Sequence, residues 1–205
     1  MTTNIETVTS LDELKALGYF ETIRTVYYTK YLMLFQHTDG KRLQIDVPDD
    51  IKEIFEGQDD FALYLKALER GNEELLSNFK EDIVLSLIIN SWIVFELIIK
   101  DLTKKDYSLS KDDISVGYKQ NIFGLTSREK KDLDLFYYIR NAIVHYNGAY
   151  YAFREMDHVF GGHPFQSKGN EGVPIFMPGP TAFKVHLEIE RLAYKAWDNS
   201  HKLKK

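Results

Sequence analysis

The longest apolar stretch of the chain, from Ile83 to Ile99 (IVLSLIINSWIVFELII), constrains the fold more than any other segment. It is shorter than the roughly 20 apolar residues that a membrane-spanning helix needs. It also contains Ser86, Asn90 and Glu96, and charged segments flank it on both sides. We therefore expect no membrane insertion, but a helix in the centre of a bundle that is covered on most sides.

Helical periodicity extends through much of the chain before and around this stretch. Apolar residues recur every three or four positions from Leu11 to Leu34, with Gly18 as a candidate break. A turn with a short extended piece is expected around Asp39-Gly40. Two short helices are then expected at residues 51–55 and 60–68, and Asn72 is expected to cap the long helix that ends near residue 102.

A further helix is predicted from Ser127 to Tyr146. Thr126 with Glu129 three residues later has the pattern of a capping box, in which each residue bonds the backbone of the other. Asn147-Gly148 supplies a stop signal at the other end. At about 100° per residue, one apolar stripe of this helix must face the core, and its members are Leu135, Ile139, Ala142, Ile143 and Tyr146.

The C-terminal third combines strand signals with a last helix. Two short strands are predicted in GAYYAFREM and VPIFM, enclosing a Gly-rich loop, VFGGHPFQSKGNEG. Pro178 and Pro180 are expected to break the chain before an amphipathic helix from Phe183 to Trp197. The predicted fold is mainly α, a helical bundle with a minor β-hairpin near the C-terminal third. Residues 1–71 are predicted to be a helical extension packed on the core domain of residues 72–205.

Composition excludes several classes of function. The chain of 205 residues has no cysteine, which excludes disulfides, thiolate nucleophiles and Cys-based zinc sites. Its net charge of −5 creates no global basic field. Residues 1–80 carry 9 Lys and Arg against 15 Asp and Glu, whereas residues 81–205 carry 17 against 16, so an anionic ligand would prefer the second part. The opening MTTNIETVTS has no signal-peptide features, and we expect a cytoplasmic protein.

Polar residues gather near the end of the 127–146 helix. Asp134, Tyr138, Asn141 and His145 form a polar stripe, while Arg140 lies about 140° from His145 around the helix axis. A purely structural reading is available, because a histidine in the last turn is favoured by the helix dipole and Asn141 is its i,i+4 neighbour. The alternative is that this stripe faces a partner or a cleft and carries chemistry.

The pattern Arg-Asn-x3-His in IRNAIVHYNG, behind a long apolar helix that contains a Glu, resembles the HEPN superfamily of small helical proteins. The likeness covers residues 72–200. It implies a metal-independent endoribonuclease without cofactors, whose Arg-x4–6-His motif comes together across a homodimer. By this resemblance Arg140 and His145 map to the catalytic pair and Asn141 to the polar residue after the Arg. Glu96 looks like the acidic residue on the earlier helix, although an ordinary i,i+4 pair with Lys100 would also explain it.

The residue types suit RNA cleavage without a metal. Histidine titrates close enough to neutrality to accept or give a proton. Arginine offers a permanently charged fork for phosphate oxygens. One Arg and one His are too few for all the tasks, so we expect a homodimer that supplies two of each. Tyrosines around the motif could stack unpaired bases, although core or interface roles are more common for them, and they are Tyr137, Tyr138, Tyr146, Tyr150 and Tyr151.

The resemblance implies an RNA substrate and a role in phage defence, toxin–antitoxin pairing or stress response, with an antitoxin or defence-system partner. In one toxin group a Tyr two positions after the His is modified by the antitoxin, but Asn147 stands there in this chain. The alternative function is a non-catalytic HEPN-like module for dimerisation or ligand sensing. Asp157, His158 and His163 could serve a metal-dependent enzyme, but they lack a recognisable ligand spacing and we expect structural or surface roles.

Overall fold

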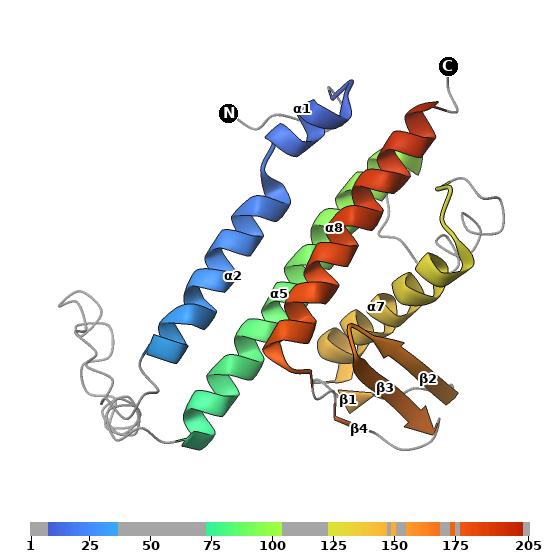
Figure 1. Cartoon of the computed structure of the whole chain (residues 1–205). Helices are drawn as coiled ribbons and strands as arrows, with labels where there is room; N and C mark the ends of the chain where they lie inside the picture. Colours follow the sequence, from blue (N-terminus) through green and yellow to red (C-terminus); the bar gives the residue numbers. More distant parts are fainter. Residues whose placement is uncertain are drawn as a thin grey trace. The chain divides into compact units, whose positions relative to one another are not determined.

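A computed structural model describes residues 8–36, 73–103, 123–146, 149–150, 155–168, 173–174 and 177–202. These residues are mainly helical, which confirms the predicted fold class (Figure 1). The helices are α1 (Leu11–Ala16), α2 (Tyr19–Gln36), α5 (Glu73–Thr103), α7 (Ser127–Tyr146) and α8 (Gly179–Lys202). The strands are β1 (Ala149–Tyr150), β2 (Glu155–Phe160), β3 (His163–Lys168) and β4 (Val173–Pro174).

The chain divides into two compact units. One consists of Met1–Thr25 together with Val84–Lys205, and the other of Val26–Ile83. The first unit contains α1, the beginning of α2, most of α5, and all of α7, α8 and the four strands. The contacts that build the candidate site belong to this unit. The domain boundary predicted between residues 71 and 72 stays a prediction.

Helices α1 and α2 follow the predicted periodicity. Ser10 caps α1 in a full capping box, because its hydroxyl accepts the Glu13 N–H at 3.2 Å while the Glu13 carboxylate accepts the Ser10 N–H at 3.3 Å. Gly18 separates the two helices with a φ of 66°, a left-handed conformation that favours glycine. The predicted helices and the break between them are therefore confirmed. Leu14 and Phe20 contribute their side chains to the core.

Helix α5 carries the apolar stretch and supplies much of the core of the first unit. Leu87, Ile88 and Trp92 are fully buried, but Ile93 and Leu97 are 45% and 47% exposed, so one part of the helix surface is uncovered within the described residues. By length and composition, Ser77–Lys100 would also qualify as a membrane span. Half of that window is buried inside the protein, and the core helix of a soluble protein meets the same criteria. The cytoplasmic location stays a prediction.

Helix α8 begins earlier than the sequence indicated. The expected start at Phe183 is wrong, because the helix starts at Gly179 and includes Pro180 in its first turn. A first-turn N–H has no partner inside the helix, so a proline costs little there. The carbonyl of Pro178 accepts the N–H groups of Thr181 and Ala182 at 2.9 and 3.1 Å. The two prolines therefore mark the beginning of the helix, and the helix also continues beyond Trp197 to Lys202.

The Gly-rich segment was predicted as a loop, but its described part, residues 159–168, belongs to a β-hairpin, so that prediction is wrong there. Strands β2 and β3 pair antiparallel, with Phe160 opposite His163 at the closed end. Gly161 and Gly162, with φ of 61° and 86°, form the two-residue turn between them. The outer strands were predicted, and short pieces of both, β1 and β4, pair with each other.

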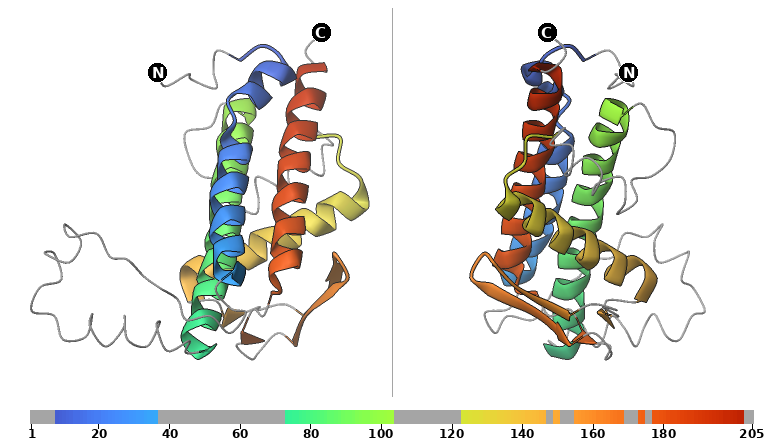
Figure 2. Two further views of the ribbon diagram at one scale, coloured as in Figure 1. Left: turned by 60° about the vertical axis from the view of Figure 1, so that its left-hand side comes forward. Right: turned by 90° about the vertical axis from the view of Figure 1, so that its right-hand side faces the viewer.

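The β2–β3 hairpin lies against α7 and near the first turns of α8 (Figure 2). The Phe160 ring meets the Phe136 ring of α7 edge to face, with centroids 4.9 Å apart. Lys184 of α8 donates from its ammonium to the carbonyl of Gly161 at 2.9 Å. The hairpin therefore contributes to the packing around α7.

Several predicted features lie outside the described residues. They are the turn at Asp39-Gly40, the helices at 51–55 and 60–68, the Asn72 cap, and the Asn147-Gly148 stop.

Gly124, which leads into α7, provides a test of this packing. Its φ is 59°, and a Cβ added there would come within 2.4 Å of the Asn199 amide nitrogen. That amide donates to the carbonyl of Phe123 at 3.0 Å, so Gly124→Ala must displace a bonded side chain as well as strain the backbone. We expect it to lower the free energy of unfolding by about 2 kcal/mol or more in urea titrations.

Gly18→Ala is the matched control. Its φ is 66°, and an added Cβ would meet nothing within 4 Å, so only backbone strain of about 1 kcal/mol should appear. Equal losses in the two variants would contradict the proposed collision with Asn199.

Candidate active site

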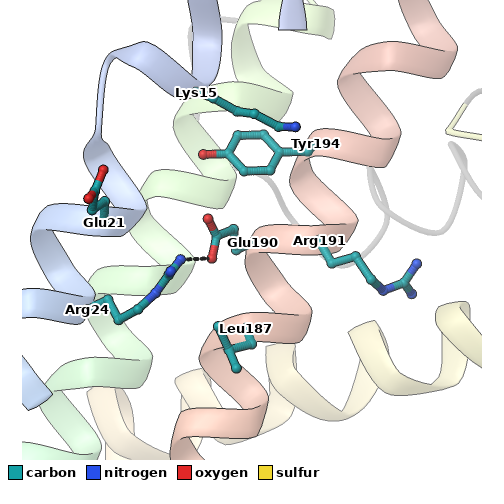
Figure 3. A pocket seen from close by; sticks show the side chains of 7 residues that line it. All are labelled: Lys15, Glu21, Arg24, Leu187, Glu190, Arg191 and Tyr194. Carbon is teal, nitrogen blue, oxygen red and sulfur yellow. Dashed lines mark hydrogen bonds and ion pairs between the residues drawn. The ribbon is translucent and has the colours of Figure 1, made fainter. Parts of the chain in front are cut away.

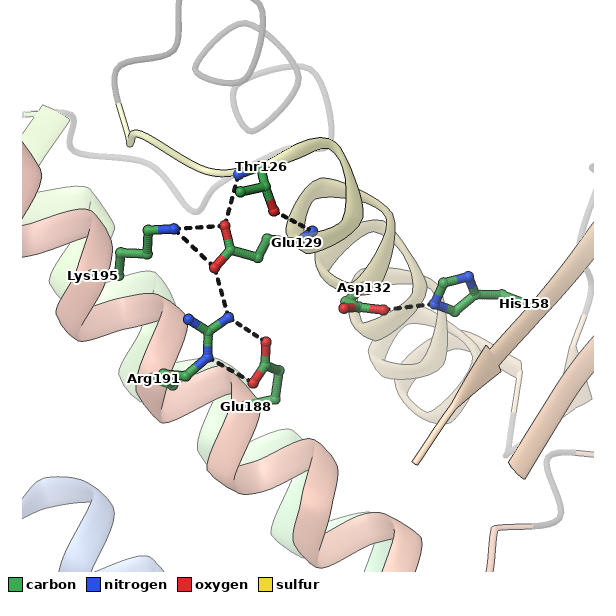
Figure 4. A network of polar contacts seen from close by, with 7 residues as sticks. All are labelled: Thr126, Glu129, Asp132, His158, Glu188, Arg191 and Lys195. Carbon is green, nitrogen blue, oxygen red and sulfur yellow. Dashed lines mark hydrogen bonds and ion pairs between the residues drawn. The ribbon is translucent and has the colours of Figure 1, made fainter. Parts of the chain in front are cut away.

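The beginning of α7 is fixed by the predicted capping box, which is confirmed (Figure 4). The Thr126 N–H donates to the Glu129 carboxylate at 2.7 Å, and the Glu129 N–H donates to the Thr126 hydroxyl oxygen at 3.3 Å. Two N–H groups that would otherwise lack partners are satisfied in this way. The sequence thus sets the start of the helix that carries the Arg-x4-His motif.

Glu129 also connects α7 to α8. Its carboxylate is 8% exposed and accepts hydrogen bonds from Lys195, at 2.9 and 2.7 Å, and from Arg191 at 2.7 Å. Burial alone would raise the pKa of this carboxyl, but the bonds from Lys195, Thr126 and Arg191 outweigh it and lower the pKa to about 2. The carboxylate therefore stays ionised and holds the two helices together.

The predicted core stripe of α7 is confirmed where its side chains are described. Leu135, Ile139 and Ala142 are buried, and Ile143 is half-buried. On the predicted polar stripe, Asp134, Tyr138 and Asn141 are all half-buried. The stripe therefore lies at the edge of the packed interior and not on the fully exposed side of the helix.

Arg140 and Asn141 form one unit within α7. The Nη1 of Arg140 donates to the Oδ1 of Asn141 at 2.8 Å, and both residues are half-buried. The bond engages a single guanidinium nitrogen and the amide oxygen. The rest of the guanidinium and the amide nitrogen of Asn141 are hydrogen-bond donors only, so this unit suits an anion.

His145 and Tyr146 form the last residues of α7. Their backbones are helical, whereas their side chains lie outside the described residues. The predicted pairing of Arg140 with His145, and the supporting role of Tyr146, therefore stay predictions.

Glu96 is hydrogen-bonded to a tryptophan whose ring contacts α7. Trp92 of α5 donates from its indole nitrogen to the Glu96 carboxylate at 2.7 Å, and its ring lies 5.9 Å from that of Tyr137. Tyr137 in turn lies 6.0 Å from Tyr138, centroid to centroid. Trp92 thus connects Glu96 to Tyr137, which lies three residues before Arg140 in the sequence. The sequence did not indicate Trp92 as a hydrogen-bond partner of Glu96.

The three residues considered as possible metal ligands have separate partners in the structure. They are Asp157, His158 and His163. His158 of β2 bonds through Nε2 to the buried Asp132 of α7 at 2.7 Å (Figure 4), a structural link between hairpin and helix. Asp157 accepts from the Gln166 amide at 3.1 Å, and the His163 ring packs on Phe165. Among the described residues, no three His, Cys, Asp or Glu side chains are grouped so that they could hold a metal ion.

Sequence reasoning missed a buried polar pair between α5 and α8. His186 is fully buried, and its Nδ1 lies 2.8 Å from the hydroxyl of Ser91, which itself donates to the Leu87 carbonyl at 2.6 Å. Because the single hydroxyl proton is used on Leu87, Nδ1 must carry the proton and donate to Ser91. Burial, and then the charge of Arg24, lower the pKa of His186 to about 4. In the sequence, the position of His186 on the apolar face of α8 was the signal that could have indicated its burial.

No protein-family model matches this chain, and no curated protein or solved structure matches it significantly. The HEPN resemblance therefore rests on the motif and its place in the chain.

The neutral state of His186 predicts a pH dependence of stability. The unfolded histidine binds a proton below about pH 6.5, whereas the folded one does so only near pH 4, so stability must fall as the pH drops between these values. Chemical denaturation of wild type and His186→Gln should show about 2 kcal/mol more loss in wild type from pH 6.5 to 4.5.

The comparison has its own control above neutrality. From pH 7.5 to 8.5 the histidine is neutral in both states, so the two proteins should show parallel curves. Parallel curves below pH 6.5 as well would mean that folded His186 accepts a proton readily, contrary to the buried arrangement.

Proposed function

We propose that this protein is a metal-independent endoribonuclease of the HEPN type that acts as a homodimer in phage defence, toxin–antitoxin pairing or stress response. The observation that carries the proposal is the Arg140–Asn141 unit, whose remaining donors lie on the last turns of α7, one turn before His145. An antitoxin or another defence protein would restrain the activity in the cell.

The reaction divides between the two chains. His145 of one protomer accepts the proton of the RNA 2′-hydroxyl, and the 2′-oxygen attacks the phosphorus while the bond to the 5′-oxygen breaks. His145 of the partner subunit gives a proton to that leaving oxygen. The products are a 2′,3′-cyclic phosphate and a free 5′-hydroxyl. Arg140 stabilises the extra negative charge on the phosphate, and Asn141 holds the guanidinium while its amide nitrogen donates to a phosphate oxygen.

Exposed apolar side chains on the two helices that carry the predicted site residues, α5 and α7, support the homodimer. Ile93 and Leu97 stand one turn apart on α5, at 45% and 47% exposed, on either side of Glu96 in the sequence. Val144 of α7, one turn after Arg140, is 46% exposed. A second copy that covered these residues would remove apolar surface from water and bring a second motif to the same interface.

The alternative function is a non-catalytic HEPN-like module for dimerisation or ligand sensing. The bond between Arg140 and Asn141 favours it as well, because a guanidinium held by its neighbour could serve an interface alone. Dimerisation does not separate the two functions, since both require it. A measurement of RNA cleavage distinguishes the two functions.

The deciding experiment is cleavage of a mixed single-stranded RNA and a tRNA pool in excess chelator. Wild type should leave cyclic-phosphate ends, and Arg140→Ala and His145→Ala should each lose at least about 100-fold in rate, because each removes a group that acts on the reacting atoms. Lys131→Ala, an exposed cation on the same helix, is the control and should cut normally. If all four proteins behaved alike, the ribonuclease function would be excluded and the non-catalytic module would be the remaining function.

The role of Asn141 is tested by two substitutions. Asn141→Ala removes the acceptor for Arg140 and one donor to phosphate, and we expect about a tenfold loss of cleavage rate. Asn141→Asp keeps an acceptor for Arg140 but places a negative charge beside the phosphate, so we expect the larger loss, about 100-fold.

Circular dichroism and thermal melting should first establish that both variants are folded. An aspartate variant with the wild-type rate would contradict the role of the amide nitrogen as a phosphate donor.

A further inference from the structure

A pocket with a volume of about 490 Å³ lies where α1 and the beginning of α2 meet α8 (Figure 3). Its size is within the range of small-molecule sites. None of the residues predicted for RNA cleavage contributes to it. The lining residues are Lys15, Glu21, Arg24, Leu187, Glu190, Arg191 and Tyr194.

The charges around the pocket fall into two groups. Arg191 is already engaged, since its guanidinium bonds Glu188 at 2.6 and 2.8 Å and Glu129 at 2.7 Å, and it points away from the other charged side chains (Figure 3). The remaining charged residues are two cations, Lys15 and Arg24, and two carboxylates, Glu21 and Glu190. The pocket therefore offers both signs of charge in equal number.

Lys15 and Arg24 can each donate hydrogen bonds to a ligand. Arg24 pairs with Glu190 through Nη2, while its Nε is buried and has no hydrogen-bond partner among the described residues. That nitrogen has almost no accessible surface, so a ligand would meet the exposed part of the guanidinium, whose side chain is 34% exposed. The ammonium of Lys15 lies 5.7 Å from the centre of the Tyr194 ring and belongs to an exposed residue, and no hydrogen bond engages it within the described residues, so it can donate to a ligand.

The lining of the pocket also includes the hydroxyl group of Tyr194. Tyr194 is half-buried, and its hydroxyl projects toward the side on which Glu21 lies (Figure 3). Burial, followed by the charge of Glu190, raises the pKa of Tyr194 to about 12, so the phenol keeps its proton and can both donate and accept. Glu21 is exposed and Glu190 is half-buried.

A ligand of a single charge would meet a like charge in this pocket, because two cations and two carboxylates line it. A ligand with both charges would complement all four side chains. We propose that the pocket binds a small zwitterion, the class of compound to which free α-amino acids belong. Glu21 and Glu190 receive its ammonium group, Lys15 and the exposed part of the Arg24 guanidinium receive its carboxylate, and Leu187 contacts its apolar part.

Ligand-observed NMR, followed by calorimetry for any hit, tests this proposal on the full chain without RNA. The probes are the common L-amino acids, each compared with the matching amine that lacks the carboxylate and the matching acid that lacks the amine. We expect saturable binding of at least one amino acid and at least tenfold weaker binding of both single-charge analogues. Absence of saturable binding up to 10 mM (about −3 kcal/mol or weaker) would overturn the proposal.

Two exposed residues allow matched variants that should not disturb folding. Glu21→Gln and Lys15→Met each remove one charge from the pocket, and each should weaken binding about three- to tenfold. Asp12→Asn and Lys131→Met make the same charge changes at exposed sites outside the pocket and should bind as wild type does. Equal binding by all of these variants would place the ligand elsewhere and reject the site.

This inference does not depend on the ribonuclease proposal. The binding experiment contains no RNA, and its variants leave Arg140, Asn141 and His145 unchanged. A failure of binding therefore says nothing against cleavage, and a failure of cleavage says nothing against binding.

Discussion

The buried carboxylate of Glu129 joins local helix formation to tertiary packing, and the position of α7 depends on it. The same two oxygens complete the cap of α7 and accept bonds from Lys195 and Arg191 of α8. Removing the carboxylate would leave cations and a helix end without their partner, a larger penalty than a surface ion pair carries. Arg140 stands 11 residues further along a rigid helix, roughly 16 Å away at 1.5 Å per residue.

Between Glu129 and Arg140, successive turns of α7 contact different parts of the protein. Asp132 holds His158 of the hairpin, Phe136 meets Phe160, and Tyr137 meets Trp92 of α5. Together with the Glu129 contacts to α8, these anchors on the hairpin and α5 fix the rotation of the helix as well as its position. The direction of the half-buried Arg140–Asn141 unit is therefore set by the fold.

The sequence predicted best those features that depend on a few neighbouring residues. The capping box at Thr126 and Glu129, the break at Gly18 and the core stripe of α7 all follow from local chemistry and helix period. Pro180 was misread because the same residue that stops a helix interior is well tolerated in the first turn. The β2–β3 hairpin was missed because His158, Pro164 and Gln166 are poor strand signals, although the Gly161-Gly162 pair is a good turn.

Contacts between distant segments were beyond this reasoning. The hydrogen bond from Trp92 to Glu96 requires particular rotamers of both side chains. The Ser91–His186 pair requires one particular alignment of α5 and α8 along their axes. The candidate site is likewise only partly defined by sequence. The motif identifies Arg140, Asn141 and His145, but the internal bond between the first two emerges only in three dimensions.

The Ser91–His186 pair has a consequence for the uniqueness of the fold. Apolar helices such as α5 and α8 can slide past each other by one turn with little change in the area they bury, because leucine, isoleucine and alanine are tolerant neighbours. A polar pair in the middle of that interface does not share this tolerance. A slip of one turn would separate Nδ1 of His186 from the Ser91 hydroxyl and leave a polar group unsatisfied in the core. The pair thus acts as a register mark that selects one alignment of the two helices, much as a buried asparagine does in a coiled coil.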